Sequence, residues 1–245
     1  MIEPAIGPWA AKLRRFDKLG DEDVRVLARA AAKTRRLGPQ ESIVREGETP
    51  QTVHVLLSGH TCRYKVLGDG RRQITAVLVP GDTCDLHGFL LRRMDHGVLT
   101  LTNCTVAQIP REALLEMTEK HPRIVRALWW TTIVDEAIVR EWVANVGRRT
   151  ASQRIAHLFC ELLTRLKAVG LAEDDPFEFP LTQAELADAT GLSTVHVNRT
   201  LQELRASGLI TLKGRLLAIH DAERLKALAG FDPIYLHLAP GQGGH

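Results

Sequence analysis

The stretch LTQAELADATGLSTVHVNRTLQELRASGLI, residues 181–210, constrains the fold more than any other part of the sequence. It contains two short helical segments separated by Gly191, a residue that readily adopts the positive φ of a tight turn. Thr182 and Glu185 have the spacing of a capping box, in which each side chain accepts the other residue's backbone N–H. Ser193 can cap the second segment. This pattern predicts a helix-turn-helix.

The second helix of this motif has one apolar face and one polar face. Val197, Leu201 and Leu204 recur at helical spacing and are expected to point inward. The opposite face is the candidate for reading DNA bases, because arginine pairs with guanine, amides pair with adenine, and valine contacts the thymine methyl group. The candidate base-reading residues are Val195, His196, Asn198, Arg199 and Gln202.

A short β-hairpin is predicted directly after this helix. Gly208 ends the helix, and LITLKGRLLAIHD, residues 209–221, has the pattern of a two-stranded wing. Polar and basic groups here are expected to hold DNA phosphates and set orientation without reading sequence. The candidate phosphate contacts are Thr182, Gln183, Ser193, Thr194, Lys213 and Arg215. Clustered cations between Arg148 and Arg215 support that expectation, although such a run also fits a solvated face.

The N-terminal half has a different pattern. A helix capped by Asp21 runs through VRVLARAAAK, and Gly38-Pro39 closes it. From there to about Pro110, short runs of Val, Leu, Thr and Ile alternate with glycines, which is typical of antiparallel strands in a roll or barrel. Leu67-Gly68-Asp69-Gly70 is the clearest hairpin turn.

A long helix is predicted from about Arg123 to Val146. Six of its residues step by four and three, which is coiled-coil spacing: Ile124, Leu128, Thr131, Asp135, Ile138 and Trp142. Further apolar residues make the helix apolar on more than one side: Trp129, Trp130, Ile133, Val134, Val139 and Val143. We therefore expect it to pack both on its own domain and on a partner helix, with an intramolecular core helix as the alternative. Gly147 is expected to be the hinge to a further helix, in which Ile155, Leu158, Phe159, Leu162 and Leu166 form an apolar stripe.

Composition limits the remaining possibilities. The 245 residues are 44% hydrophobic and 25% charged, enough for two folded domains. The sequence contains no apolar run of the roughly 18 to 20 residues that a membrane span needs, and its start has no secretory pattern, so a cytoplasmic protein without a membrane partner is expected. The four cysteines, Cys62, Cys84, Cys104 and Cys160, show no metal-ligand spacing.

With these residues in view, the chain resembles the Crp/Fnr superfamily of bacterial transcription regulators over about residues 16–231. The resemblance covers FDKLGDEDVRVLARAA, the glycines Gly47, Gly59, Gly70 and Gly81, and GLSTVHVNRTLQELRASGLI. It implies an α+β chain with an N-terminal antiparallel β-roll of the cyclic-nucleotide-binding-like jelly-roll type, a long dimerisation helix and a C-terminal winged helix-turn-helix.

The resemblance also implies domain boundaries and partners. We expect a sensor domain over 16–120, the dimerisation helix over 121–147, the DNA-binding domain over 148–231 and a tail over 232–245. A homodimer would read a palindromic site on double-stranded DNA, and an activator would also contact RNA polymerase. Val195 stands where well-known members have a glutamate, so the operator should differ from theirs.

The sensor departs from the family in the residues that recognise ligands. Members that bind cyclic nucleotides hold the ribose with a glutamate shortly after PGD and the phosphate with an arginine. This chain has Leu86 and Asp95 near those positions, so cyclic AMP is not expected. An iron–sulfur cluster is not expected either, because no cysteine precedes Cys62. Haem is disfavoured, although His87 lies near the expected effector pocket. The candidate pocket residues are Leu86, His87, Asp95 and Trp129.

Two alternatives come from other functional classes. A cupin-type enzyme would need clustered histidine and glutamate ligands, and the sequence has no HxH, so no enzymatic activity is expected. A ligand-binding module whose winged helix binds protein is the other alternative. The sequence leaves open the effector, the operator, the regulated genes, and the choice between activation and repression.

Overall fold

The computed structural model describes residues 6–16, 19–172 and 176–238. Contacts group them into two compact units. Unit 1 takes in the described residues up to Lys65, Val77–Glu136 and Leu238, and unit 2 takes in Val66–Ala76 and Ala137–His237. The predicted dimerisation helix is thus divided between the units, and the first residues of the predicted tail belong to unit 2. The rest of that tail, 239–245, lies outside the described residues.

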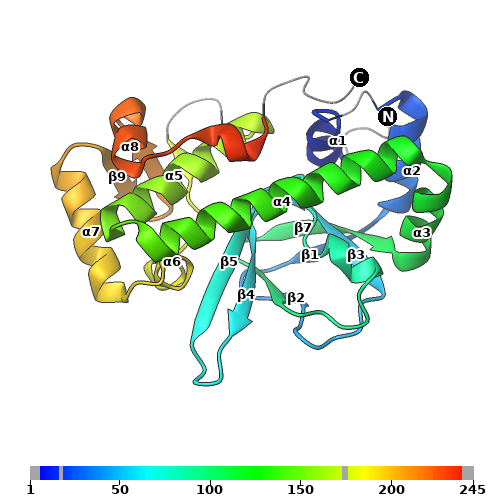
Figure 1. Ribbon diagram of the computed structural model, residues 1–245, viewed down its shortest axis with the longest axis horizontal. Coiled ribbons are helices and arrows are strands. Elements are labelled where there is room, and N and C mark those ends of the chain that lie inside the picture. The colour runs from blue at the N-terminus through cyan, green and yellow to red at the C-terminus, as the bar shows by residue number, and fades with distance from the viewer. Residues whose placement is uncertain (1–5, 17–18, 173–175, 239–245) are drawn as a thin grey trace. The chain divides into compact units, whose positions relative to one another are not determined.

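Most of the predicted antiparallel β-roll lies in unit 1, and only residues 66–76, with the larger part of β5, are grouped with unit 2 (Figure 1). One sheet has the strand order β1-β7-β3, made of Lys33–Leu37, Cys104–Pro110 and Thr52–Ser58. The other has the order β2-β6-β4-β5, made of Ser42–Val44, Gly97–Thr100, Thr61–Val66 and Arg72–Leu78. Opposed pairs such as Val55 with Ala107 and Cys62 with Leu99 are antiparallel.

The glycines that carry the family resemblance have a conformational reason for their positions. Gly47, Gly59, Gly70 and Gly81 all have φ between 80° and 93°, a region that side chains disfavour. At Gly59 a Cβ atom would also lie 2.2 Å from the carbonyl oxygen of Asn103. The spacing of these glycines therefore records where the roll turns.

Helices α1 (Gly7–Leu13), α2 (Asp21–Ala30) and α3 (Arg111–Lys120) pack against this roll with the first part of α4. The fully buried Trp9 anchors α1, a helix that the sequence pattern did not reveal. The prediction for α2 was wrong at both ends. Gly20 is the N-cap, its N–H donated to Asp23, and the helix ends at Ala30 because β1 begins at Lys33.

Helix α4 spans Pro122–Arg148. The six residues predicted as its coiled-coil seam are 9% exposed or less within a single chain: Ile124, Leu128, Thr131, Asp135, Ile138 and Trp142. The face with coiled-coil spacing is therefore the face that the chain itself covers. Four apolar residues of the same helix are 40% to 69% exposed and form what we call the exposed stripe: Trp129, Ile133, Val139 and Val143.

Unit 2 is built on the last part of α4 and on α5 (Ala151–Ala168). The predicted apolar stripe of α5 is confirmed, since Ile155, Leu158, Phe159, Leu162 and Leu166 are all buried. The expected hinge at Gly147 was wrong, because α4 continues to Arg148 and α5 begins after its N-cap, Thr150. Helices α6 (Gln183–Thr190), α7 (Thr194–Ala206) and α8 (Ala222–Ala229) follow, with the 3-10 helix η3 (Pro233–Leu236).

The wing of unit 2 has three strands, in the order β8-β10-β9. The predicted pair is present as β9 (Ile210–Lys213) and β10 (Leu216–Ile219). The third strand, β8 (Phe177–Glu178), lies between α5 and α6 and was not predicted. Two residues are too few to show strand periodicity, so only the pairing with β10 identifies this strand.

A buried polar cluster joins α4, α5 and η3 inside unit 2. The fully buried Glu161 accepts hydrogen bonds from Trp142 Nε1, Arg165 Nη1 and Tyr235 OH at 2.9–3.1 Å. His157 is 1% exposed, and its ring is stacked with that of Tyr235 at a centroid distance of 5.9 Å. Its Nε2 lies 3.2 Å from a carboxylate oxygen of Glu141. Burial, aided by the positive charge of Arg149, lowers the pKa of His157 to about 4.

This shift predicts a pH dependence of folding. Unfolded histidine titrates near pH 6.5, so between about pH 6.5 and pH 4 the unfolded chain binds a proton that folded His157 does not. The free energy of unfolding should therefore fall as the pH drops through this range. The variant His157→Phe removes that titration, and urea denaturation followed by circular dichroism should show a weaker decline. An identical pH dependence in both proteins would contradict the assignment.

Candidate nucleic-acid interface

The predicted capping box at the start of α6 is confirmed. Thr182 Oγ1 accepts the N–H of Glu185 at 3.2 Å, and Glu185 Oε2 accepts the N–H of Thr182 at 2.7 Å. Both N–H groups lie at the start of the helix, where backbone N–H groups have no hydrogen-bond acceptor within the helix itself. The box therefore fixes where α6 begins, and it leaves Thr182 and Gln183 exposed at that end.

The turn between α6 and α7 has the predicted form. Gly191 adopts the left-handed conformation with φ 67°, and its N–H is donated to Ala187. The small side chain of Ala187 is buried at this point. Ser193 Oγ then accepts the N–H of His196 at 3.2 Å, which starts α7 one residue later. These contacts set the direction of α7 relative to α6.

Helix α7 separates its faces as its sequence predicts. Val197, Leu201 and Leu204 are 2% exposed or less and anchor the helix to unit 2. On the other face Val195 is 79% exposed, and the side chain of Arg199 is 66% exposed. A valine so exposed on a rigid helix offers an apolar contact of the size of a methyl group beside a cation that can grip guanine.

A hydrogen bond joins the outward residues of the two helices. Asn198 Nδ2 on α7 donates to Gln183 Oε1 at the start of α6 over 3.2 Å. The sequence prediction gave these residues separate roles, Asn198 to a base and Gln183 to a phosphate. Their contact orients the Asn198 amide, so Gln183 also helps position a candidate base-reading group.

Arg199 has a neighbour that the sequence prediction left out. Its Nε lies 3.8 Å from Glu203 Oε1, one turn further along α7, and both side chains are more than half exposed. An exposed pair at this distance contributes little to stability. Glu203 therefore biases the position of the Arg199 side chain without holding it tightly.

The wing presents its two predicted phosphate contacts differently. Lys213 is exposed at the end of β9, next to the turn at Gly214. Arg215 is half-buried, and its Nη1 donates to the carbonyl oxygen of Pro180 at 3.0 Å. Arg215 therefore fastens the wing to the chain just before α6. Ser193 and Thr194 are exposed at the start of α7.

The four residues predicted to line an effector pocket differ in burial. Leu86 belongs to the apolar core of unit 1, whereas Trp129 is 69% exposed and the side chain of Asp95 is 79% exposed. His87 is exposed on the 3-10 helix η2 (Leu86–Phe89). The candidate effector pocket therefore stays a prediction.

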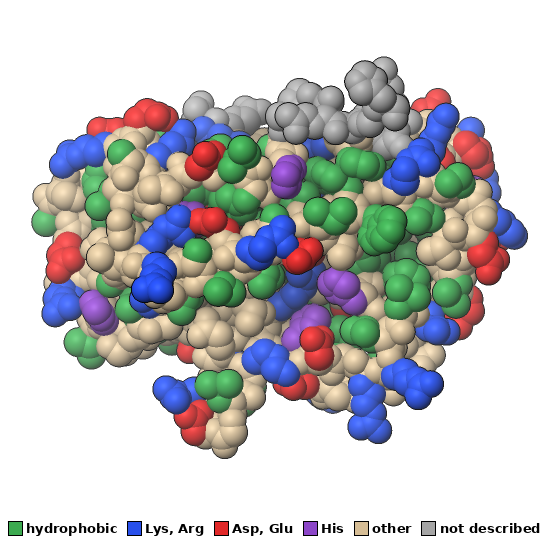
Figure 2. All heavy atoms as spheres, viewed as in Figure 1, with side chains coloured by type: hydrophobic (Ala, Val, Ile, Leu, Met, Phe, Trp, Pro, Cys, Tyr) green, Lys and Arg blue, Asp and Glu red, His purple; other side chains and the backbone are tan. Residues whose placement is uncertain are grey.

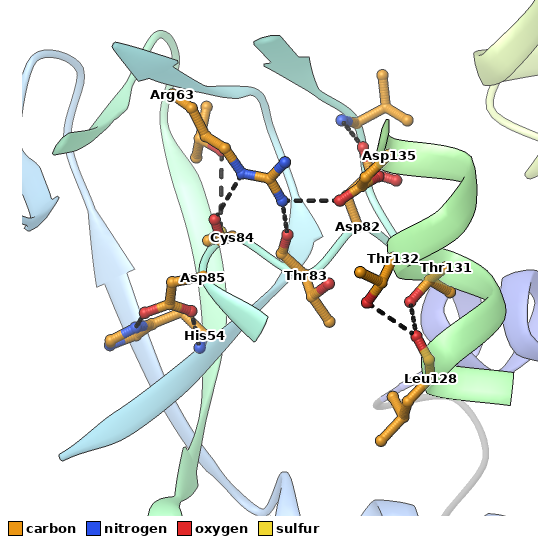
Figure 3. A network of polar contacts seen from close by, with 12 residues as sticks. His54, Arg63, Asp82, Thr83, Cys84, Asp85, Leu128, Thr131, Thr132 and Asp135 are labelled. Carbon is orange, nitrogen blue, oxygen red and sulfur yellow. Dashed lines mark hydrogen bonds and ion pairs between the residues drawn. The ribbon is translucent and has the colours of Figure 1, made fainter. Parts of the chain in front are cut away.

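The sequence prediction missed a buried cation inside the roll. Arg63 of β4 is 7% exposed and donates to two backbone carbonyls and to Asp135 of α4 (Figure 3). Its position in a strand of alternating pattern gave no sign of burial. Among the described residues, no group of three or more His, Cys, Asp or Glu side chains has metal-binding geometry. No described helix is long and apolar enough to span a membrane.

The antiparallel roll, the long helix and the winged helix-turn-helix with its exposed reading face together define a class: a transcription regulator that binds DNA. Family models agree with both halves. A Crp-like helix-turn-helix domain matches residues 153–228, and a cyclic nucleotide-binding domain matches residues 34–121.

Known relatives specify the family. The transcriptional activator protein FnrL of Cereibacter sphaeroides is 30% identical over 196 residues, which cover 78% of this chain and 78% of FnrL. The nitrogen fixation regulation protein FixK of Bradyrhizobium diazoefficiens is 27% identical over 90% of this chain and 86% of its own. The solved structure of FixK2 from Bradyrhizobium japonicum matches with a TM-score of 0.73 at 26% identity, over 80% of this chain and 96% of that chain. The chain belongs to the Crp/Fnr family.

Proposed function

We propose that this regulator acts as a cytoplasmic homodimer that reads a palindromic operator with two copies of α7, without control by cyclic AMP and without enzymatic activity. The observation that carries the proposal is that one chain exposes two surfaces, the stripe on α4 and the outward face of α7. If it activates transcription, as the names of its relatives state for them, RNA polymerase is a further partner.

The exposed stripe of α4 supports a dimer. Trp129 and Val143 are two heptads apart and therefore occupy the same position on the helix. Hydrophobic side chains are visible along α4 in the space-filling view, interleaved with charged ones (Figure 2). Exposed apolar surface of this kind marks protein interfaces. A second copy fits it, since a two-fold axis places the same stripe of each chain against the other.

The outward face of α7 supports sequence readout. Arg199 can bind the O6 and N7 of guanine, Asn198 or Gln202 can pair with adenine, and Val195 can contact a thymine methyl group. A two-fold dimer would place two such helices in major grooves about one helical turn apart. Five exposed residues near this face are candidate phosphate contacts: Thr182, Gln183, Ser193, Thr194 and Lys213.

The alternative in which the winged helix binds protein makes a different prediction about salt. DNA binding through phosphate contacts weakens steeply as the salt concentration rises, because binding must release counterions from the DNA into the solution. A protein interface centred on the apolar Val195 would respond far less.

The first prediction concerns the dimer. The variant Ile133→Glu places a charge in the exposed stripe and should shift the protein to monomers in sedimentation equilibrium. Leu171→Glu is the matched control, because Leu171 is 50% exposed and is not part of α4, so the dimer should stay intact. A dimer that survives Ile133→Glu would rule out this interface.

The second prediction concerns base readout. Arg199→Ala should abolish specific operator binding, at a cost of about 1 to 3 kcal/mol per half-site, and leave non-specific binding nearly unchanged. Arg224→Ala on α8 removes the same charge from another exposed position and should preserve specificity. Both are measured by gel-shift titration with operator and scrambled DNA. Retained specificity in Arg199→Ala would refute the assignment.

The third prediction concerns the effector. Cyclic AMP should produce no binding heat in a calorimetric titration and should not tighten operator binding. The reason is that Leu86 lies in the apolar core and Asp95 would repel a phosphate. Micromolar affinity for cyclic AMP would contradict the proposal.

A further inference from the structure

Arg63 and Asp135 form a buried ion pair that the proposed function does not yet use. Their side chains are 9% and 10% exposed, and Arg63 Nη2 lies 2.9 Å from Asp135 Oδ2. The same nitrogen donates to the carbonyl oxygen of Thr83 at 2.7 Å, and Nε donates to that of Cys84 at 2.8 Å. We call this set of contacts the Arg63 bridge.

The bridge joins three parts of unit 1 that are far apart in the sequence (Figure 3). Arg63 comes from β4, Thr83 and Cys84 come directly after Pro80-Gly81-Asp82, and Asp135 comes from α4. In the members of the family that bind cyclic nucleotides, the residues after this PGD segment hold the ligand. Here the carbonyls of the same segment are occupied by a side chain of the chain itself.

The segment after Gly81 is also held from its other side. Asp82 accepts the N–H of Val79 and forms an ion pair with Lys12, both through carboxylate oxygens at 2.9 Å or less. Asp85 accepts the backbone N–H and the Nδ1 of His54 at 2.6 and 2.8 Å. None of these contacts involves α4. They hold in place the segment whose carbonyl oxygens accept hydrogen bonds from Arg63.

A buried guanidinium is costly unless its charge is balanced and its N–H groups are bonded. Asp135 supplies the balancing charge, and the two carbonyls bond the remaining side of the group. Removing Asp135 alone would leave the cation buried without its partner. The preferred position of α4 on the roll is therefore coupled to the burial of Arg63.

We propose that the Arg63 bridge holds α4 to the roll with the chain's own side chains, so that operator binding requires no small molecule. This rests on the proposed function, because it concerns how the DNA-binding dimer is kept active.

The first test removes any small molecule. The full-length protein is unfolded in concentrated guanidinium chloride, dialysed and refolded, and both preparations are titrated with operator. The bridge predicts that refolded protein binds as tightly as the native preparation. A refolded dimer with native circular dichroism that has lost operator binding, while the native preparation binds, would overturn the bridge. Failure of both preparations to bind would overturn the proposed function instead.

The second test breaks the bridge. Asp135→Asn should speed amide hydrogen exchange in residues 122–136 and weaken operator binding by about tenfold, within the usual range for coupling between sites. Asp135→Glu retains the carboxylate and should restore much of the affinity. The control Glu116→Gln breaks the exposed ion pair with Lys120 on α3 and should change neither readout.

A double variant keeps the test decisive if Asp135→Asn fails to fold. Arg63→Met with Asp135→Leu removes both charges together, which buried pairs often tolerate without loss of stability. The bridge predicts a folded protein whose operator affinity is still about tenfold weaker, because α4 has lost its polar anchor. Wild-type affinity in the folded double variant would show that the pair is merely structural and would overturn the proposal.

Discussion

Helix α4 must satisfy two demands at once, and the rest of the structure depends on how it does so. One face, whose residues include Ile124 and Trp142, is buried within the chain. The other face exposes Trp129, Ile133 and Val143. The buried face is not wholly apolar, because it includes Asp135. That carboxylate is tolerable only with a cation beside it, and Arg63 is that cation. The exposed face is the surface that the proposed dimer uses.

The helix-turn-helix shows a different logic, in which nearly every constraint is local. The capping box, the left-handed Gly191 and the Ser193 cap each act over two to four residues. They hold the backbone so that the outward face of α7 does not need to be stabilised by its own contacts. This is why Val195 can be 79% exposed on a rigid helix. Rigid presentation of exposed groups is what base readout requires.

The same contrast explains what the sequence could predict. The roll, the winged helix-turn-helix and the apolar stripe of α5 follow from glycine positions, caps and periodicity. Heptad spacing on α4 gives a period but not the identity of the partner, so the sequence alone did not show that the chain itself covers the face from Ile124 to Trp142. The strand β8 and the end of α2 at Ala30 depend on pairing with distant strands. The Arg63 bridge joins residues 72 apart in the sequence, and the Gln183–Asn198 contact joins residues 15 apart. No local sequence pattern therefore predicts either contact.

The central claim is that two copies of α7, related by a two-fold axis, read one DNA site. Selection of bound sequences from a random duplex pool by the full-length protein, followed by sequencing, tests it most directly. The account predicts a single enriched motif with two inverted half-sites whose centres are about 10 base pairs apart or a multiple of that distance. Enrichment of no motif, or of a motif without two-fold symmetry, would contradict it.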